Sequence, residues 1–311
     1  MRCVLSACVV VLLAACTSVD APRSREASTD PGSTAPTATA TTAAATTAAA
    51  TTAAALTATP SAIVAAALPH VFVIVMENTS LEVAMHQPYI ASLAERYALA
   101  TNYQAVGSPS LPNYLALTSG STWGITDDDY HRLPATGIGV QLDAARIPWR
   151  AYMEGLTARG CLDSPGPYAL KHNPFAYYGG GCPANVVPLD ALAADLGSIA
   201  EQFTWITPDL CHDGHDCDGA TADGWLAMMV PRILASPSWH DGVLFIVWDE
   251  PGPGGSQKLP LLVVSDALLE HTTALPHDHY SLLATIEDLL KLPRLGAAAG
   301  ARGFSELLRM P

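Results

Sequence analysis

The chain has 311 residues and a net charge of −14, with 29 acidic side chains against 15 lysines and arginines. This acidity argues against a nucleic acid partner, because phosphate backbones are bound by clustered lysine and arginine. Beyond a low-complexity N-terminal stretch, roughly 240 residues remain, which is enough for one domain with a substantial core.

Residues 1–16 are predicted to form a bacterial lipoprotein signal peptide. Arg2 supplies a positive charge, and the apolar run 4–15 is too short to span a bilayer. Small residues precede Cys16 in a pattern that resembles a lipobox, whose cysteine receives a diacylglyceryl group and becomes the new N-terminus. We therefore expect an exported protein anchored to the cell membrane by a lipid on Cys16. An ordinary signal peptide that happens to contain a cysteine is the alternative.

Residues 17–66 are predicted to be a disordered linker. They consist mostly of Thr, Ala, Ser and Pro, with scarcely an aromatic or branched apolar residue. Such a segment buries too little apolar surface to offset the entropy lost on ordering. It is expected to hold a catalytic domain, residues 67–311, away from the membrane.

Short apolar runs alternate with helix-like stretches through the rest of the chain. The expected strands are 71–75, 101–106, 203–206, 243–248 and 261–265, and the expected helices are 88–100, 189–196, 224–234 and 281–290. This alternation predicts the α/β class, with a mostly parallel central sheet and helices on both faces. The Gly-, Pro- and Tyr-rich segment 165–188 is interpreted as a long active-site loop or cap.

Four cysteines lie in the expected domain, namely Cys161, Cys182, Cys211 and Cys217. An exported protein meets an oxidising environment, so two disulfides are expected rather than free thiols or a zinc site. Four cysteines permit three connectivities, and local closure favours Cys161 with Cys182 and Cys211 with Cys217.

Polar side chains follow several of the apolar runs directly. Glu77 and Asn78 end the first expected strand, and Asp249 and Glu250 end the fourth. Ligands of open α/β sheets bind at the carboxyl ends of the strands, so chemistry is expected there. Carboxylate and amide oxygens suit Mg²⁺, Mn²⁺ or Ca²⁺ better than a thiophilic ion such as Zn²⁺. The acidic run 127–129 lacks the spacing of a calcium loop and is interpreted as a solvated turn.

Six motifs in order resemble the phosphoesterase family that groups bacterial acid phosphatases with phospholipase C-type enzymes, a branch of the alkaline-phosphatase-like superfamily. They are VIVMENTS at 73–80, SPSLPNYLALTSG at 108–120, KHNPF at 171–175, ITPDLCHDGHDC at 206–217, VWDE at 247–250 and HDHYSLLATIEDLL at 277–290. The resemblance implies an alkaline-phosphatase-like fold.

The resemblance also implies a divalent metal site, formed by Glu77, Asn78, Ser110, Asp249 and Glu250. The superfamily often uses two ions, but the shortage of matching Asp and His ligands in this chain favours one. Some relatives carry two aspartates where this chain has Asp249 and Glu250. In this reading Ser110 is both a metal ligand and the nucleophile that attacks phosphorus.

Four further residues complete the catalytic set that we expect around the serine. Asn113, one helical turn along, is expected to donate to a phosphate oxygen. His172 lies in a loop that is not expected to bury an imidazole, so it is expected to contact phosphate or leaving group. His215 and His279 each have a neighbouring carboxylate, an arrangement that orients a general acid or a ligand.

The sequence thus predicts an exported, lipid-anchored hydrolase of phosphate esters that forms a phosphoryl-enzyme on Ser110. Phosphomonoester hydrolysis of the acid phosphatase kind is expected first, and a phospholipase C-like phosphodiesterase is the alternative. A lipoprotein that binds an anion or a partner without turnover is a third hypothesis from a different class.

Overall fold

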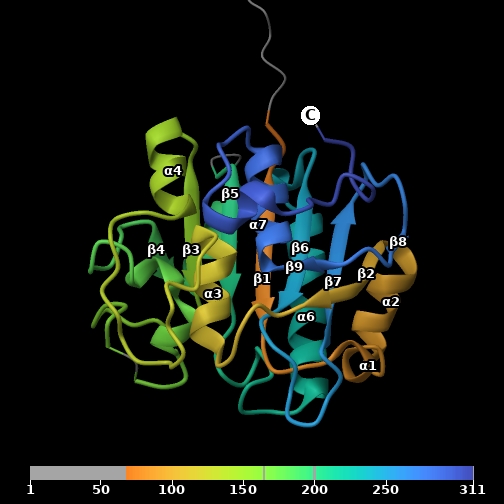
Figure 1. The fold of residues 1–311 in the computed structure, drawn as a ribbon, viewed down its shortest axis with the longest axis horizontal. Coiled ribbons are helices and arrows are strands. Elements are labelled where there is room, and N and C mark those ends of the chain that lie inside the picture. The colour runs from red at the N-terminus through yellow and green to blue at the C-terminus, as the bar shows by residue number, and fades with distance from the viewer. Residues whose placement is uncertain (1–67, 164, 199–200, 311) are drawn as a thin grey trace, which may run out of the picture. The chain divides into compact units, whose positions relative to one another are not determined.

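A nine-stranded sheet runs through the part of the chain that the computed structural model describes, residues 68–163, 165–198 and 201–310 (Figure 1). In spatial order the strands are β4 (Val186–Pro188), β3 (Trp149–Met153), β5 (Phe203–Thr207), β1 (Val71–Met76), β6 (Val243–Trp248), β7 (Lys258–Ser265), β2 (Ala98–Gln104) and β8 (Thr272–Thr273), with β9 (His277–Asp278) also paired to β2.

The five strands from β4 to β6 are parallel, whereas β7 is antiparallel to both of its neighbours. Val71 of β1 pairs with Phe203 of β5 and with Val243 of β6, so these three strands start in register. Their carboxyl ends therefore meet at one edge of the sheet. The predicted α/β class with a mostly parallel sheet is confirmed.

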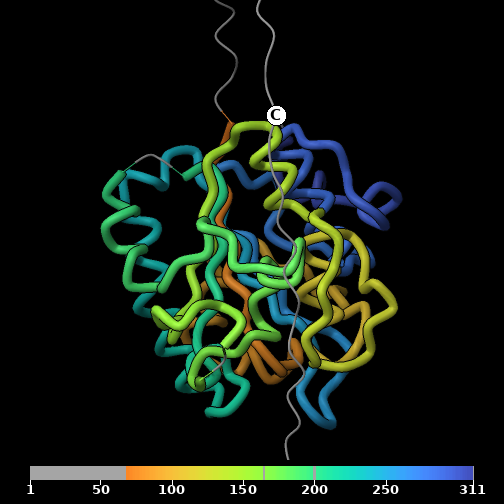
Figure 2. Tube along the Cα trace, turned by 90° about the vertical axis from the view of Figure 1, so that its left-hand side faces the viewer, coloured from red at the N-terminus to blue at the C-terminus, as the bar shows by residue number. Residues whose placement is uncertain are grey.

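Helices cover both faces of the sheet (Figures 1 and 2). One face packs against α3 (Ser110–Ser119), α4 (Ile138–Ala145) and α7 (His279–Leu289), and the other against α2 (Pro88–Arg96), α5 (Leu192–Asp195) and α6 (Gly219–Leu234). Alternate residues of β1 enter the two cores, as the period of a strand requires. The remaining short helices are α1 (Leu81–Ala84), η1 (Leu170–His172), η2 (Pro174–Ala176), η3 (Leu189–Ala191), η4 (Pro237–Trp239) and η5 (Gly296–Gly300).

Several predicted boundaries are wrong. The structure begins α6 at Gly219 and β7 at Lys258, five and three residues before the expected starts. The helix expected over 88–100 ends at Arg96, because Tyr97 is extended and β2 begins at Ala98. Ala98 and Ala100 are fully buried against the core, so tertiary packing overrides their helical propensity. The strand expected over 101–106 accordingly starts three residues earlier and ends at Gln104.

Both predicted disulfides are present, Cys161–Cys182 and Cys211–Cys217. The predicted signal peptide, the lipid-bearing Cys16 and the predicted linker lie outside the described residues. Among the helices of the described part, none has the length and apolar character needed to cross a bilayer.

Candidate active site

Glu77 and Asp249 lie side by side where the parallel strands end. Glu77 follows β1 and Asp249 follows β6, and both side chains are fully buried. Between them, the amide of Asn78 donates to Asp249 Oδ1 at 3.3 Å. Asn78 has φ of 47°, a left-handed conformation that asparagine tolerates better than most residues. The chain therefore turns sharply after Glu77. Glu77 and Asn78 lie at the end of a strand, as the sequence predicted.

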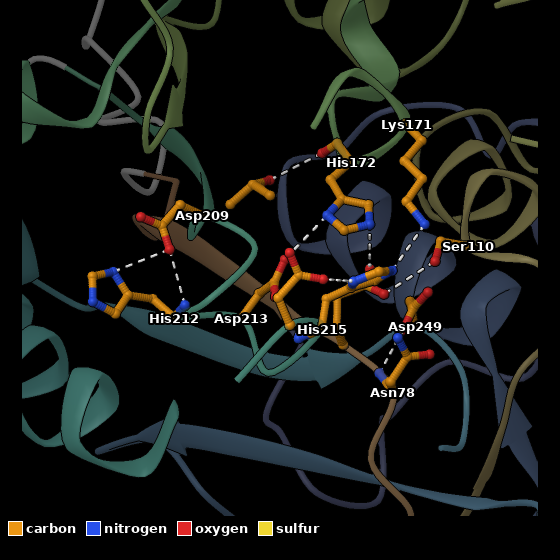
Figure 3. A network of polar contacts seen from close by, with 12 residues as sticks. Asn78, Ser110, Lys171, His172, Asp209, His212, Asp213, His215 and Asp249 are labelled. Carbon is orange, nitrogen blue, oxygen red and sulfur yellow. Dashed lines mark hydrogen bonds and ion pairs between the residues drawn. The ribbon is translucent and has the colours of Figure 1, made fainter. Parts of the chain in front are cut away.

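Ser110 begins α3 and points at the same acids (Figure 3). Its Oγ donates to Glu77 Oε2 at 3.0 Å, and Ser110 is also close enough to Asp249 to act on that carboxyl group. All ten residues of α3 are buried. The hydroxyl is thus fixed between two carboxylates by a helix that is itself locked into the core.

Asn113 lies one turn further along α3, yet its amide is fully engaged with the backbone. Oδ1 accepts from the amides of Val106 and Gly107 at 3.1 and 3.0 Å, and Nδ2 donates to the carbonyls of Gly107 and Pro109. These bonds hold the loop that leads into Ser110. In this geometry both Nδ2 donors of Asn113 bond carbonyls of the loop before Ser110.

His172 is buried, contrary to the expectation that its loop would leave the imidazole accessible. The residue is 1% exposed, and its ring stacks on Tyr114 with centroids 5.1 Å apart. Its Nε2 lies 3.2 Å from Glu77 Oε1 and its Nδ1 lies 3.1 Å from Asp213 Oδ2, although none of these four atoms makes a hydrogen bond. Burial is the main cause that holds the pKa of His172 well below its usual value. His172 therefore lies behind the acids as a neutral ring.

His215 is the more accessible histidine of the group, with 28% of its side chain exposed. Its Nδ1 donates to Asp216 Oδ1 at 2.7 Å, and its Nε2 accepts from Lys171 Nζ at 3.1 Å. This pairing is the imidazole and carboxylate arrangement that the sequence predicted. The carboxylate orients the ring and leaves Nε2 on the side of Lys171.

His279 is fully buried beneath Asp249. Its Nε2 donates to the carbonyl of Asp249 at 2.6 Å, and its Nδ1 accepts from the Tyr103 hydroxyl at 2.8 Å. Burial lowers the pKa of His279 to about 4, which agrees with a neutral ring that donates at one nitrogen and accepts at the other. Both ring nitrogens are occupied, one of them by the backbone of Asp249.

The site concentrates negative charge in a buried place. Burial is the largest cause that raises the pKa of Glu77 well above its usual range, that of Asp249 to about 8 and that of Asp213 to about 7. The charge of half-buried Glu250 raises the pKa of Asp249 further. Three oxygens of the site also have no hydrogen-bond partner among the described residues: Glu77 Oε1, Asp213 Oδ2 and Asp249 Oδ2. Buried acids without partners are costly, and a cation between them would satisfy these oxygens.

The residues present therefore fit a divalent cation held by hard oxygen donors, as the sequence predicted. Glu77, His172 and His215 also bring one potential ligand atom each within 4.8 Å of one another. A second such group, Glu154, Asp209 and His212, lies apart from the site. In that group Glu154 Oε2 and Asp209 Oδ1 already accept hydrogen bonds, unlike the unpartnered oxygens beside Ser110.

Three residues of the site were not among those predicted from the sequence. Asp213 faces His172, and Lys171 Nζ bonds both His215 and Asp128. Asp128 also accepts from the amide of Leu111, so it is not the free solvated residue expected in the run 127–129. The sequence held one indication for two of these residues: Asp213 lies two positions from the predicted His215, and Lys171 lies next to the predicted His172. Nothing in the sequence pointed from Asp128 to α3.

Comparison with known proteins places this geometry in a family. A model of the phosphoesterase family matches residues 83–293. The phosphate-repressible acid phosphatase of Penicillium chrysogenum is 29% identical over 244 residues, which cover 71% of this chain and 58% of the fungal protein. The chain thus spans less than two thirds of that relative. The phosphatidylinositol-3-phosphatase of Mycobacterium tuberculosis is 28% identical over 256 residues, covering 78% of this chain and 85% of that protein.

A solved structure supports the fold. A protein of the alkaline phosphatase superfamily from Vibrio parahaemolyticus superposes with a TM-score of 0.57 at 10% identity, over 77% of this chain and 70% of that one. Similarity at this level of identity concerns the fold alone, and it confirms the predicted alkaline-phosphatase-like architecture.

Proposed function

Because this chain belongs to the phosphoesterase family, we propose that it hydrolyses phosphate esters through a phosphoryl-enzyme on Ser110. The observation that carries the proposal is the Ser110 hydroxyl, which bonds Glu77 at 3.0 Å beside the buried, unpartnered oxygen of Asp249. A hydroxyl held between two acids at the strand ends has both a proton acceptor and a place for a cation.

We assign a divalent ion, Mg²⁺, Mn²⁺ or Ca²⁺ rather than Zn²⁺, to Glu77, Asn78, Ser110, Asp249 and Glu250. When bound, such an ion lowers the pKa of the serine hydroxyl and neutralises negative charge on the transferring group. One ion is proposed, since the unpartnered acid oxygens beside Ser110 belong to Glu77 and Asp249.

The steps of the proposed reaction are then assigned to side chains of this protein. Ser110 Oγ attacks phosphorus and its proton passes towards Glu77 Oε2, while the bond from phosphorus to the leaving oxygen breaks. When both of its nitrogens carry a proton, His215, oriented by Asp216, supplies its Nε2 proton to the leaving oxygen, and it later accepts one from the water that cleaves the phosphoserine. Inorganic phosphate is released and the serine regains its proton.

Other predicted residues have supporting roles in this proposal. Asn113 fixes the loop before Ser110, and His279 fixes the backbone of Asp249. His172 fills the space between Glu77 and Asp213 and limits their movement. Each acts through another residue of the site and not on the substrate itself.

Phosphate monoesters are the proposed substrates. The Penicillium and Mycobacterium relatives are both named as phosphatases, which supports this choice over the phospholipase C-like phosphodiesterase that the sequence left open. A protein that only binds an anion would not need a nucleophile bonded to a buried acid, so the non-catalytic alternative is disfavoured.

We also propose that the protein is exported and anchored to the membrane through Cys16. The two disulfides support an oxidising compartment, because they are rare in the cytosol. No nucleic acid partner is proposed, given the net charge of −14.

Trapping the phosphoryl-enzyme tests the function. The metal-loaded protein is mixed with p-nitrophenyl phosphate, quenched in acid and digested, and the peptide containing Ser110 is weighed by mass spectrometry. We expect one added phosphoryl group on that peptide and none in Ser110→Ala. Turnover without modification at Ser110 would favour direct attack by water, and absence of turnover on monoesters and on a choline-bearing diester would contradict the function.

A further inference from the structure

Lys171 carries a positive charge into the acidic site. It lies in η1 beside His172, and in Figure 3 its side chain extends to His215, on the side of the site where Ser110 lies. Nζ bonds Asp128 Oδ2 at 3.0 Å and His215 Nε2 at 3.1 Å, with 20% of the side chain exposed. The ammonium is therefore held in place and still reachable from solvent.

Asp128 ties this ammonium to the nucleophile's helix. Its Oδ2 accepts from Lys171, while its Oδ1 accepts from the amide of Leu111 at 3.0 Å. Leu111 directly follows Ser110 in the first turn of α3. A single carboxylate thus sets the position of Lys171 relative to the first turn of the helix that carries the hydroxyl.

The charge of Lys171 acts on the acids of the site. Its ammonium bonds Asp128 directly, and its charge interacts with those of Glu77 and Asp249. When a divalent ion is bound and the acids of the site are ionised, their combined negative charge exceeds the positive charge of the ion, so a phosphate group that enters is still repelled. The repulsion grows with substrate charge, so a monoester dianion needs a nearby cation more than a diester monoanion does.

We propose that Lys171 binds a nonbridging oxygen of the phosphoryl group and makes the site prefer phosphate monoester dianions over phosphodiester monoanions. This specificity role rests on the proposed function. An ammonium has three N–H donors, and Asp128 and His215 engage two of them, which leaves a third for the substrate. The ammonium distinguishes monoesters from diesters by the additional negative charge of the monoester.

The ratio of two specificity constants tests this role. The kcat/KM values for p-nitrophenyl phosphate and for methyl p-nitrophenyl phosphate, which share a leaving group, are measured above the second phosphate pKa of about 6. We expect Lys171→Met to lower the monoester-to-diester ratio by at least roughly tenfold, through a fall on the monoester. Lys171→Arg, which keeps the charge, should restore most of the ratio. Lys291→Met removes a charge from an exposed position after α7 and should leave the ratio unchanged.

The outcomes separate the two proposals. An active Lys171→Met variant with an unchanged ratio contradicts the role of Lys171 and leaves the proposed function intact. A parent protein that hydrolyses neither ester contradicts both. If Lys171→Met does not fold, Lys171→Gln and Asp128→Asn provide the same measurement, with the ratio expected to fall in both and an unchanged ratio contradicting the proposal.

Discussion

Ser110 Oγ donates a 3.0 Å hydrogen bond to Glu77 Oε2 across 33 positions of the sequence. The bond joins the first residue of α3 to the end of β1, and both partners are buried. It brings a hydroxyl and a carboxylate into contact at a buried position, where water cannot take the place of either group. Perturbing either partner should therefore have a large effect on chemistry.

Removing the hydroxyl tests the nucleophile. Ser110→Ala should lower kcat by at least roughly a hundredfold, because no other side chain supplies the attacking oxygen. The midpoint of thermal unfolding should change little. Ser92→Ala, at an exposed position of α2, is the matched control and should keep parental turnover. Near-parental kcat in Ser110→Ala would show that the serine is not the nucleophile.

Neutralising Asp249 should have opposite effects on metal binding and on stability. Asp249→Asn should weaken metal binding by at least about tenfold. Substitution of residues that only hold a metal ligand in place already costs metal proteins about this much affinity. Without metal, the variant should be more stable than the parent by on the order of 1 kcal/mol or more, because it no longer buries an unpartnered carboxylate oxygen.

Metal analysis by plasma mass spectrometry and urea unfolding with a chelator measure these two effects of Asp249→Asn. Asp266→Asn, at an exposed position after β7, should change neither quantity. Parental metal content in Asp249→Asn would place the ion elsewhere.

The Cys211–Cys217 disulfide encloses Asp213 and His215 in a small ring. Cys211→Ala/Cys217→Ala should lower kcat by at least about tenfold, since small displacements of site residues are costly. Its loss of stability should be about 1 kcal/mol smaller than that of Cys161→Ala/Cys182→Ala, because the chain-entropy model penalises the longer loop more. Kinetics and urea unfolding measure the two effects, and full activity in the first variant would remove this role of the ring.

Glu287 predicts a pH dependence of stability that is separate from the site. It is buried in α7, and burial raises its pKa from 4.5 to about 8. Between these values the folded protein keeps a proton that the unfolded chain has lost. The contribution of Glu287 to the free energy of unfolding is therefore fully present below pH 4.5 and is lost as the pH rises to about 8. The slope is at most about 1.4 kcal/mol per pH unit.

Glu287→Gln should remove that slope and be more stable than the parent at pH 8. Urea unfolding at three pH values across the window measures the difference, with the exposed Glu95→Gln as control. Parallel pH profiles of parent and Glu287→Gln would contradict the buried, protonated acid.

The lipid anchor is tested by fractionation of cells. Cys16→Ser should release the protein from the membrane fraction without changing its specific activity, because the predicted linker separates anchor and domain. A Cys16→Ser protein that stays in the membrane with its signal uncleaved would indicate a signal anchor instead.

The sequence predicted those parts of the fold that local pattern determines. The runs that became β1 and β6 are apolar throughout, and their last residues lead directly to Glu77 and Asp249. β3 was not predicted, because Arg150 and Tyr152 interrupt its apolar character while Asp195 bonds both of them from another element. A strand whose polar groups are satisfied at a distance has no local signal.

The site was likewise predictable where local pattern determines it and unpredictable where distant contacts do. Glu77, Ser110 and Asp249 lie together as expected, because strand ends and the helix start bring them to one edge. The burial of His172 depends on Tyr114, and the bonding of Asn113 depends on the loop at Val106 and Gly107. These contacts arise from the packing of segments that are far apart or irregular, so residue types and spacing alone do not reveal them.

Because α3 is completely buried, the position of the nucleophile and the preference for a leaving group depend on different segments of the chain. Attack geometry resides on a helix without an exposed residue, whereas Lys171 and His215 come from loops at the solvent boundary. Substitutions in those loops can alter which alcohol is released while the serine keeps its place. Directed evolution of leaving-group preference should therefore draw its beneficial changes from 165–188 and 208–218, and α3 should tolerate almost none.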